Sequence, residues 1–534
     1  MESKQEAVDY QHIEQQPGTM PPLGDEPIQG EGSSARKEKA NAGSLEDGPA
    51  EHLTPEHREY LLSRHKTVDL DPLPAIDPAD PLNWPSWKKN TNLFLIAFHA
   101  LMTTFIAAGI IPAFEQLSED LGVSLAEASY LTSIQILVLG IAPIFWKPIS
   151  NRFGRRPVWL ISTFGSMICN IGSAESYTYA SQLVTRALVA FFISPAIAIS
   201  SVVVTETFFS KERGQKMGIW TLMVTLGPSV GPFLMGFVAD HTHGWQWIYW
   251  IFAITNGMQF VLYFFFSPET LYVRNRVDST TSKSPFQRKY LKFGKIGPRP
   301  LAAADFLTPI KLFAYPSIVI PAISYAITFN FASILCTVET PQIFAPKFHF
   351  NAQQIGLQFI GPIIGSSLGE VLGGHGSDFW MRRKNAQLGR SRHAAPEHRI
   401  WLSYVGFATV ICGLVVFTVQ ADRIQSYDVS PIVGFAIAAF GNQIITTVLI
   451  TYTVDCHHEH SASIGVFINL LRSPFWFPYM FNSLGLSGSG VLVAGIVVVF
   501  ALLPTIFIQW KGASIRKKRE AMDNSLQQMN TITR

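Results

Sequence analysis

Three ionisable side chains, Arg186, Glu370 and Arg472, interrupt otherwise apolar stretches of this chain. A charge at the centre of a bilayer costs about 2.5 to 3.5 kcal/mol on insertion scales, so each such residue is a candidate functional site. A carboxyl group in apolar surroundings can take up and release a proton, and we interpret Glu370 as a proton acceptor. Arg472 could be its partner or a purely structural cap.

Two loops repeat one pattern of small, polar and basic residues. The first contains Asn151, Arg152, Gly154, Arg155 and Arg156, and the second contains Gly374 and Asp378. Small residues let two helices approach, and arginines can bond to helix carboxyl-terminal carbonyls or to acidic groups across a cleft. We expect contacts that form in one conformation and break in another. The alternative is a basic loop that only fixes topology.

Helix-loosening residues are concentrated between Leu226 and Gly236. The pattern consists of Gly227, Pro228, Gly231 and Pro232. Such residues are tolerated inside a membrane helix when neighbouring helices cover its backbone, so they predict a smooth and bendable packing face. A plain close-packing motif is the alternative.

The stretch from Cys456 to His460 resembles a metal cluster in composition only. Its residues are adjacent rather than spaced along one face of a helix, so we predict no metal site. The chain has no phosphate-binding loop GxxxxGK[ST] and no HExxH, so we predict no cofactor and no enzyme of a standard type. The four cysteines show no paired spacing.

The elements that must position these residues are apolar helices. The 534 residues are 48% hydrophobic and only 15% charged, which favours a membrane protein. We predict an all-α membrane protein with twelve transmembrane helices in two pseudo-symmetric bundles of six. The expected spans are 91–112, 129–149, 157–174, 183–205, 217–239, 247–267, 316–338, 355–376, 400–420, 431–451, 462–482 and 490–509.

These spans divide the chain into five parts. Residues 1–90 are rich in Glu, Gly, Pro, Gln and Ser and are expected to form a disordered cytoplasmic tail. The other parts are bundles at 91–267 and 315–510, a basic linker at 268–314 and a tail at 511–534. Short loops on alternate sides carry Lys and Arg, so we expect both termini and the linker to face the cytoplasm.

The first loop, with the sequence GRRPV and its flanks, resembles the loop signature of the major facilitator superfamily, and the second loop resembles its degenerate partner. Lys147 and Asn151 stand where that family has Gly and Asp. The Gly227 pattern resembles an element of proton-antiport exporters, with Pro232 in place of Gly. The Asp-Pro and Asn-Trp-Pro segment before the first span, Arg213-Gly214, the tryptophans before span six and Pro268-Glu269-Thr270 are similar to the fungal twelve-span drug:proton antiporter family.

This resemblance implies a proton-coupled efflux pump that exports toxins, drugs or a secondary metabolite across the plasma membrane. It implies small-molecule, proton and lipid partners, no nucleic acid and a monomer. Arg186 begins an element associated with proton handling, although Ala190 replaces its Gly. Glu206 and Arg213 keep the spacing of a pair that helps to close the inward face, with a weak surface ion pair as the alternative.

Spans one, four, seven and ten line the central cavity in that superfamily. The polar side chains that this chain places there are His99, Thr103, Ser194, Tyr325, Asn330, Asn442 and Gln443. Together they could hold an organic molecule, while each alone could instead make an interhelical hydrogen bond. Two rival functions stay open: a polyamine or organic cation carrier of the same fold, and a membrane-embedded receptor or enzyme.

Overall fold

The computed structural model describes residues 53–68, 70–242, 244–272, 303–388, 395–456, 467 and 477–516. The chain divides into two units, residues 1–69 and residues 70–534. In the first unit, α1 spans Pro55–His65. Thr54 caps α1 by accepting a hydrogen bond from the His57 amide at 3.3 Å, and Lys66 ends it in the left-handed conformation.

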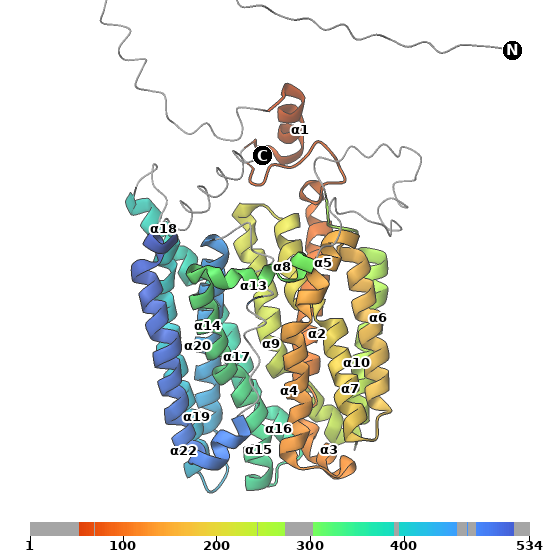
Figure 1. The fold of residues 1–534 in the computed structure, drawn as a ribbon, viewed down its shortest axis with the longest axis vertical. Coiled ribbons are helices and arrows are strands. Elements are labelled where there is room, and N and C mark those ends of the chain that lie inside the picture. Colours follow the sequence, from red (N-terminus) through yellow and green to blue (C-terminus); the bar gives the residue numbers. More distant parts are fainter. Residues whose placement is uncertain are drawn as a thin grey trace, which may run out of the picture. The chain divides into compact units, whose positions relative to one another are not determined.

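The second unit is built from helices throughout its described residues (Figure 1). Up to residue 272, which we call the first half, the elements are η1 (Pro81–Asn83), α2 (Ser86–Ala108), η2 (Ile111–Ala113), α3 (Phe114–Leu121), α4 (Leu125–Ile141), α5 (Pro143–Phe153), α6 (Arg155–Ala174), α7 (Tyr179–Ile193), α8 (Pro195–Thr207), α9 (Ser210–Thr242) and α10 (Gln246–Phe266).

The second half comprises the described residues from 303 onward. Its elements are α12 (Ala303–Phe306), α13 (Thr308–Lys311), η3 (Leu312–Ala314), α14 (Pro316–Phe329), η4 (Asn330–Leu335), α15 (Cys336–Phe348), α16 (Ala352–Leu357), α17 (Ile360–Val371), η5 (Leu372–Gly376), α18 (Ser377–Leu388), η6 (Pro396–Ile400), α19 (Trp401–Arg423), α20 (Ser430–Cys456), α22 (Phe477–Val497) and η8 (Val498–Leu502).

Several predicted spans are broken rather than straight. Pro143 and Pro195 each stand at the first position of a new helix, where the missing N–H costs least. The axes of α4 and α5 are bent by 42° at the first of these breaks. In the second half the breaks are the π-helical segments η4, η5 and η8. Sequence patterns gave the spans but not these breaks.

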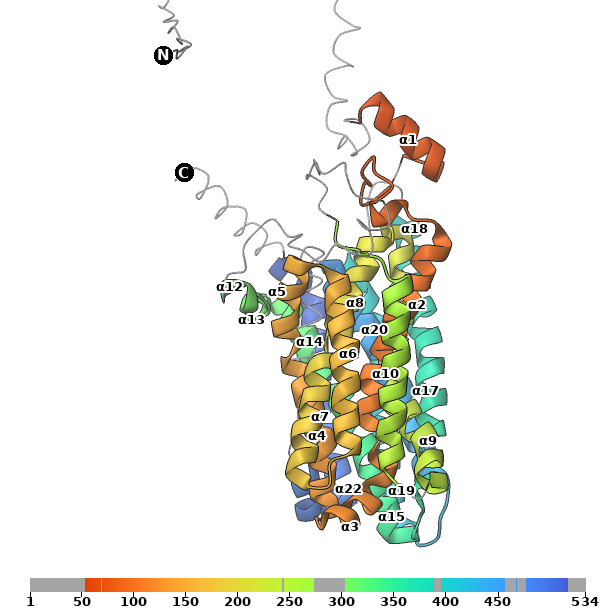
Figure 2. The ribbon, with the colours of Figure 1, turned by 90° about the vertical axis from the view of Figure 1, so that its right-hand side faces the viewer.

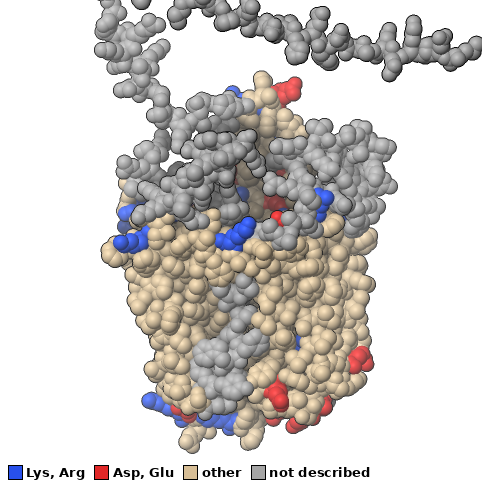
Figure 3. Space-filling view, in the orientation of Figure 1, with Lys and Arg blue, Asp and Glu red and all other residues tan. Residues whose placement is uncertain are grey.

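Nine helices of the described chain are long and apolar enough to cross a membrane, and the bent pair α4 and α5 makes a tenth. The predicted third span is α6, a 20-residue helix that buries the polar side chains of Ser162, Ser166 and Asn170. Of the predicted eleventh span, 462–482, the structure describes only residues 467 and 477–482. Figure 3 shows most charged side chains of the visible face at its two ends, and the described surface between them is almost free of charge.

The helices of each half pack mainly on one another. α2 packs against α8 and α9, and α6 against α7 and α10; in the second half, α20 packs against α14, α17 and α19. Figure 2 shows these helices running in nearly the same direction. The halves meet where α9 packs on α16 and α17, where η2 packs on α15 and α16, and where α4 packs on α15.

One expectation for residues 1–90 needs correction, because residues 75–90 are folded. Asp80 accepts hydrogen bonds from the amides of Ala75 and Leu82, at 2.9 and 3.0 Å. Asn83 donates to the carbonyls of Ala75 and Asp77 at 2.8 and 2.9 Å. These side chains satisfy the backbone of a turn that precedes α2, so the first span begins at Ser86 rather than at residue 91.

Candidate functional site

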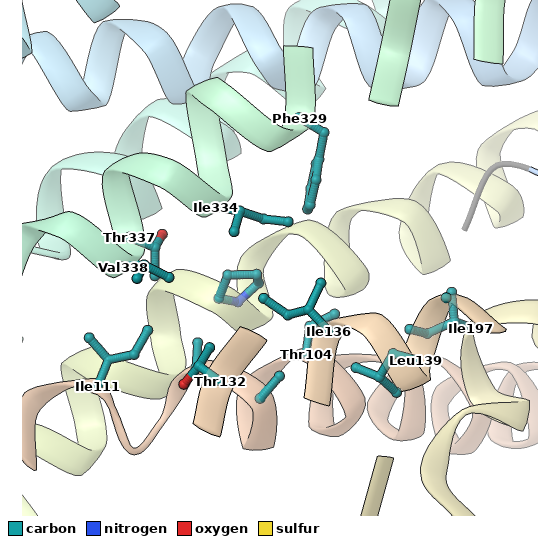
Figure 4. A pocket seen from close by; sticks show the side chains of 14 residues that line it. Thr104, Ile111, Thr132, Ile136, Leu139, Ile197, Phe329, Ile334, Thr337 and Val338 are labelled. Atoms are coloured by element: carbon teal, nitrogen blue, oxygen red, sulfur yellow. The ribbon is translucent and has the colours of Figure 1, made fainter. Parts of the chain in front are cut away.

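A pocket lies between the two halves of the second unit (Figure 4). It contains about 540 Å³ of empty space, part of which is open solvent. Its walls come from α2, η2, α4, α8 and α9 of the first half and from α14, η4 and α15 of the second. The lining residues are Thr104, Ala107, Ala108, Ile111, Thr132, Ile136, Leu139, Gly140, Ile197, Pro228, Phe329, Ile334, Thr337 and Val338.

The walls of this pocket are almost entirely apolar. Within the described part of the chain, its only polar side chains are Thr104, Thr132 and Thr337. The hydroxyls of Thr132 and Thr337 are buried and have no hydrogen-bond partner in the protein. An apolar cavity with a few convergent polar groups is the usual form of a site for a small organic molecule.

Pro228 connects the glycine and proline pattern to the pocket, which it lines. Because proline has no N–H, the carbonyl of Val224 four residues earlier has no helical donor. The hydroxyl of Thr104 in α2 donates to that carbonyl oxygen at 2.9 Å. A side chain of the first span thus donates the hydrogen bond that Pro228 cannot donate within the fifth span.

The glycines of the same pattern let α9 touch the backbone of α2. A Cβ atom added at Gly227 would overlap Thr104 Oγ1 and would lie 2.8 Å from the carbonyl oxygen of Leu101. One added at Gly231 would lie 2.7 Å from the carbonyl oxygen of Phe105. The pattern therefore forms the predicted smooth packing face, and Pro232 contributes to it on the other side: its carbonyl oxygen would lie 2.9 Å from a Cβ at Gly356 in α16.

None of the seven predicted cavity side chains lines this pocket. In the first half they bond between or within helices. His99 Nδ1 is 3.2 Å from the hydroxyl of Tyr263, and its Nε2 is 3.4 Å from that of Ser162. Thr103 donates to the carbonyl of His99 at 2.8 Å, and Ser194 donates to the carbonyl of Phe191 at 2.9 Å.

The second-half candidates are Tyr325, Asn330, Asn442 and Gln443. Tyr325 is buried beside Phe329, which does line the pocket. The side-chain oxygens of Asn330, Asn442 and Gln443 are buried and accept no hydrogen bond from the protein. Gln443 donates through Nε2 to Glu370. These amides therefore have free acceptor capacity in this conformation.

Glu370 lies at the junction of three helices. Its Oε2 accepts hydrogen bonds from Gln443 Nε2 and Thr447 Oγ1 of α20, both at 2.6 Å. Its Oε1 faces α9 of the other half, since a Cβ added at Gly218 would lie 3.0 Å from it. This half-buried carboxylate has two hydrogen-bond donors on one side and the opposite half on the other. Separation of the halves would therefore change the surroundings of Glu370.

Arg186 is almost fully buried, with 1% of its surface exposed. Its Nε donates to the carbonyl of Leu131 and its Nη2 to that of Ala107, both at 2.9 Å. Its Nη1 lies 3.3 Å from the hydroxyl of Tyr249. Ala107 lies in the last turn of α2, where carbonyl oxygens attract a cation. Arg186 thus links α7 to three other helices of the first half, α2, α4 and α10.

The first basic loop forms a closed network at one end of the first half. Arg155 pairs with Glu206 of α8 at 2.8 Å and donates to Ser150 and Asn151 at 2.7 and 2.6 Å. Gly154, with φ of +102°, is the residue at which the chain enters α6, immediately before Arg155. We call this end of the unit the Arg155 end and the opposite end the η2 end.

Glu269, which follows α10, supplies the amino-terminal cap that Gly154 lacks. Its carboxylate accepts from the amides of Arg155 and Arg156 at 2.7 and 3.0 Å and from that of Leu271 at 2.9 Å. Burial raises the pKa of the Glu269 carboxyl, and the three amides and the charge of Arg155 oppose that rise. Arg156 also donates to the carbonyl of Phe264 at 2.7 Å.

The second loop repeats this network in the second half. Arg399 pairs with Asp378 at 3.1 Å and with Asp455 of α20 at 3.5 Å, and it donates to Ser377 at 2.9 Å. Gly374 precedes this network in η5, where an added Cβ would lie 3.7 Å from Glu370. Ser377 and Asp378 thus correspond to Ser150 and Asn151.

Both networks act within one half, not across a cleft. Glu206 pairs with Arg155 rather than with Arg213, whose Nε is buried without a hydrogen-bond partner. Burial lowers the pKa of Arg213, and the charge of Asp71 opposes that change. Arg152 is half-buried, while Arg472 and residues 457–460 lie outside the described residues. Among those described, no group of three His, Cys, Asp or Glu side chains could hold a metal.

Sequence reasoning missed the buried carboxyl of Glu339 in α15. Only 4% of its surface is exposed, and its Oε1 has no hydrogen-bond partner. The signal was present but was hidden by a boundary error, because the predicted span ended at residue 338 whereas the helical segment extends to Phe348.

Comparisons with known proteins agree with this architecture. A sequence model of the Major Facilitator Superfamily matches residues 93–475. The chain is 28% identical to the MFS-type transporter atr4 of Stereocaulon alpinum, over 83% of this chain and 81% of that protein. It is 28% identical to the efflux pump vrtL of Penicillium aethiopicum, over 88% and 93%.

Two solved structures share the fold. One is the human organic anion transporter MFSD10 (TETRAN), with a TM-score of 0.54 and 14% identity over 79% of this chain and 99% of that one. The other is a bacterial homologue of the lysosomal transporter Spinster in an inward-facing, unoccupied conformation, with a TM-score of 0.53 and 14% identity over 81% and 99%. With its helical halves, its paired loop networks and a family match over most of its length, this chain is a multi-pass membrane protein and belongs to the major facilitator superfamily of transporters.

Proposed function

We propose that this transporter is a proton-coupled efflux pump that exports small amphiphilic organic molecules by alternating access. In such a mechanism two helical halves rock around a central site and expose it to one side of the membrane at a time. The observation that carries the proposal is the apolar pocket between the two halves, together with the contacts that join the halves at the η2 end.

The chemistry of the pocket favours an amphiphilic solute. Its length is lined by Ile136, Leu139 and Phe329, which suit an apolar body, and the hydroxyls of Thr132 and Thr337 suit one polar group. Relatives named as efflux pumps, such as vrtL and the radE protein of Floropilus chiversii, support export as the direction.

Proton coupling is assigned to Glu370. Its carboxylate lies between α20 and α9, so its protonation would alter contacts within the second half and toward the first. A unit charge that crosses the membrane gains about 2.3 kcal/mol per 100 mV, and a tenfold proton ratio adds about 1.4 kcal/mol, which together support concentrative export.

We place the protein in the plasma membrane with both termini in the cytoplasm. This orientation rests on the basic residues that cluster at the Arg155 end, including Arg155, Arg156 and Arg399. In this orientation the η2 end faces the exterior, and the contacts of η2 with α15 and α16 close that side.

A polyamine carrier is the rival function of the same fold. Polycations need several acidic partners, and the described lining of the pocket offers no carboxylate. The two functions are separated by loading cells that express the chain with either a neutral lipophilic fluorescent dye or radiolabelled spermidine. We expect faster loss of the dye than in control cells, and unchanged loss of spermidine.

A protonophore should abolish the difference in dye loss. The Glu370→Gln variant should behave like the protonophore treatment while reaching the membrane in normal amounts. The Glu175→Gln variant, which removes an exposed carboxylate at the end of α6, is the matched control and should export normally. Spermidine export without dye export would establish the rival function instead.

A further inference from the structure

Glu339 lies just beyond one end of the pocket. In Figure 4, Ile111 and Thr132 of the first half and Thr337 and Val338 of the second half lie at the same end of the pocket. Glu339 follows Val338 directly in α15, and its side chain is 96% removed from solvent. It therefore lies on the helix that meets η2 and α4 of the first half at the η2 end.

Among the described residues, the elements that pack against α15 place no positive side chain next to Glu339. α15 packs against η4, α16, η2 and α4. The first three contain no titratable residue, and α4 contains only Glu127 and Tyr130. On α15 itself, Cys336 is the closest titratable group, and Lys347 is bonded to the carbonyls of Ala421 and Asp422.

Polar atoms without partners are concentrated on the two helices that meet there. On α4, the hydroxyl of Thr132 and both amide atoms of Gln135 are buried and unpaired, and on α15 the hydroxyl of Thr337 and Oε1 of Glu339 are in the same condition. A buried carboxylate with neither a counter-charge nor a full set of donors is strongly disfavoured relative to the neutral acid.

α4 and α15 belong to different halves, so separation of the halves at the η2 end would bring water to Glu339. In water the carboxylate is stable, whereas in the closed arrangement only the acid is. Closing this end therefore requires the carboxylate to take one proton from exterior water. After the opposite end opens, the acid can return that proton to water in the pocket.

We propose that Glu339 is a proton-binding residue whose protonation controls closure of the η2 end. This inference rests on the proposed function for its direction, and it adds a second protonation site to Glu370. The two sites differ in kind. Glu370 accepts two hydrogen bonds that favour its ionised form, whereas Glu339 is buried on the helix that meets the other half and its Oε1 accepts no hydrogen bond.

The test follows the opening of the η2 end at equilibrium, with no substrate and no proton gradient. In the full chain, Cys169, Cys336, Cys412 and Cys456 are replaced by alanine, and Ala113→Cys provides a reporter in η2, where Ala113 is fully buried. The purified protein in lipid nanodiscs is treated with a methanethiosulfonate reagent between pH 5.5 and 8.5. Each rate is divided by that of the unfolded protein at the same pH, which removes the titration of the thiol itself.

We expect the normalised rate to rise with pH, by at most about tenfold per unit, since closure takes up one proton. The Glu339→Gln variant, which mimics the neutral acid, should react slowly at every pH. Glu339→Asp should keep a pH-dependent rate with a shifted midpoint, and Glu370→Gln should keep the pH dependence. If the Glu339→Gln variant does not fold, the proposal is tested by the midpoint of the pH profile of Glu339→Asp.

Three results would overturn the proposal: a flat profile for the parent protein, a Glu339→Gln profile that matches the parent, or an unshifted midpoint for Glu339→Asp. The labelling experiment tests the role of Glu339, and the dye export experiment tests the proposed function, so either hypothesis can be rejected without the other. Protonophore-sensitive export with no effect of Glu339 on labelling would remove this inference alone. Labelling that depends on Glu339 in a protein that exports nothing would remove the proposed function alone.

Discussion

Thr104 donates its hydroxyl hydrogen to the carbonyl oxygen of Val224 at 2.9 Å, and this bond links the first span to the fifth beside the pocket. The carbonyl is available because Pro228 cannot donate to it. The Thr104→Val variant should leave the carbonyl buried and unpaired, at a cost of about 1 to 3 kcal/mol. The melting temperature of the purified Thr104→Val variant should be lower than that of the parent protein. Thr104→Ser retains the hydroxyl, so its melting temperature should fall less. Equal melting temperatures for Val and Ser would contradict this account.

Gly227 tests the close approach of α9 and α2. The Gly227→Ala variant places a methyl group in overlap with Thr104 Oγ1 and 2.8 Å from the backbone of Leu101, so the helices must separate. Overpacking of this kind costs about 1 to 3 kcal/mol. Gly495→Ala is the control, because nothing lies within 4 Å of its added Cβ. The temperature of thermal unfolding should be lowered by Gly227→Ala and not by Gly495→Ala. A similar effect at both positions would mean that helix propensity, not packing, determines the result.

The two loop networks differ in burial, which predicts an order of effects. The side chains of Arg155 and Glu206 are 5% and 20% exposed, whereas those of Arg399 and Asp378 are 14% and 48% exposed. Breaking a buried pair leaves an unpaired charge and costs about 3 to 5 kcal/mol, while exposed pairs contribute about 0 to 1 kcal/mol. Glu206→Gln should therefore lower the melting temperature more than Asp378→Asn. The reverse order would be inconsistent with the assigned partners.

Glu269 gives a dependence of stability on pH. Because burial raises the pKa of this carboxyl, the folded protein holds the proton more tightly than the unfolded protein does. Its contribution to stability is thus greatest below the ordinary pKa of 4.5 and is lost as the pH rises through the folded value. The stability of the parent protein relative to Glu269→Gln should decline as the pH is raised above 4.5. An increase over that range, measured by thermal unfolding, would mean that the amides and Arg155 outweigh burial.

Glu370→Gln should abolish gradient-driven export while the protein still folds and reaches the membrane. The amide can still bond with Gln443 and Thr447 but cannot exchange a proton. Export driven only by a substrate gradient should persist, because movement of substrate down its own gradient needs no proton coupling. Both fluxes can be measured in vesicles with and without a pH gradient. Normal pH-dependent export by the variant would eliminate Glu370 as the coupling residue.

The sequence predicted the helical class, most of the spans and the close packing at Gly227 and Gly231, since these follow from long apolar runs and local backbone chemistry. It did not predict the pairing of Glu206 with Arg155, because many arginines lie at that end and only tertiary packing selects one. The pocket was also missed. Its walls are threonines and aliphatic residues such as Ile136 and Leu139, which no sequence motif distinguishes from an ordinary core.

Boundary errors had the largest consequence for the candidate site. Helix ends are the least certain part of a sequence reading, and a span ended at residue 338 excluded Glu339 from the buried ionisable residues. Conversely, polar residues such as His99 and Thr103 were interpreted as cavity groups because they lie in the expected spans. In the structure they bond to Tyr263, Ser162 and neighbouring carbonyls, which burial in an apolar medium requires of polar groups.

Substrate-driven proton movement in proteoliposomes tests the central claim most directly. The purified protein is reconstituted with a pH-sensitive dye trapped inside, and a non-ionisable amphiphilic probe that the protein transports is added outside. Inward movement of the probe through an antiporter must carry protons outward, so the interior should become alkaline, and Glu370→Gln should remove the change. Protein-dependent entry of the probe with an acidified interior, or with no change in pH, would contradict proton-coupled export.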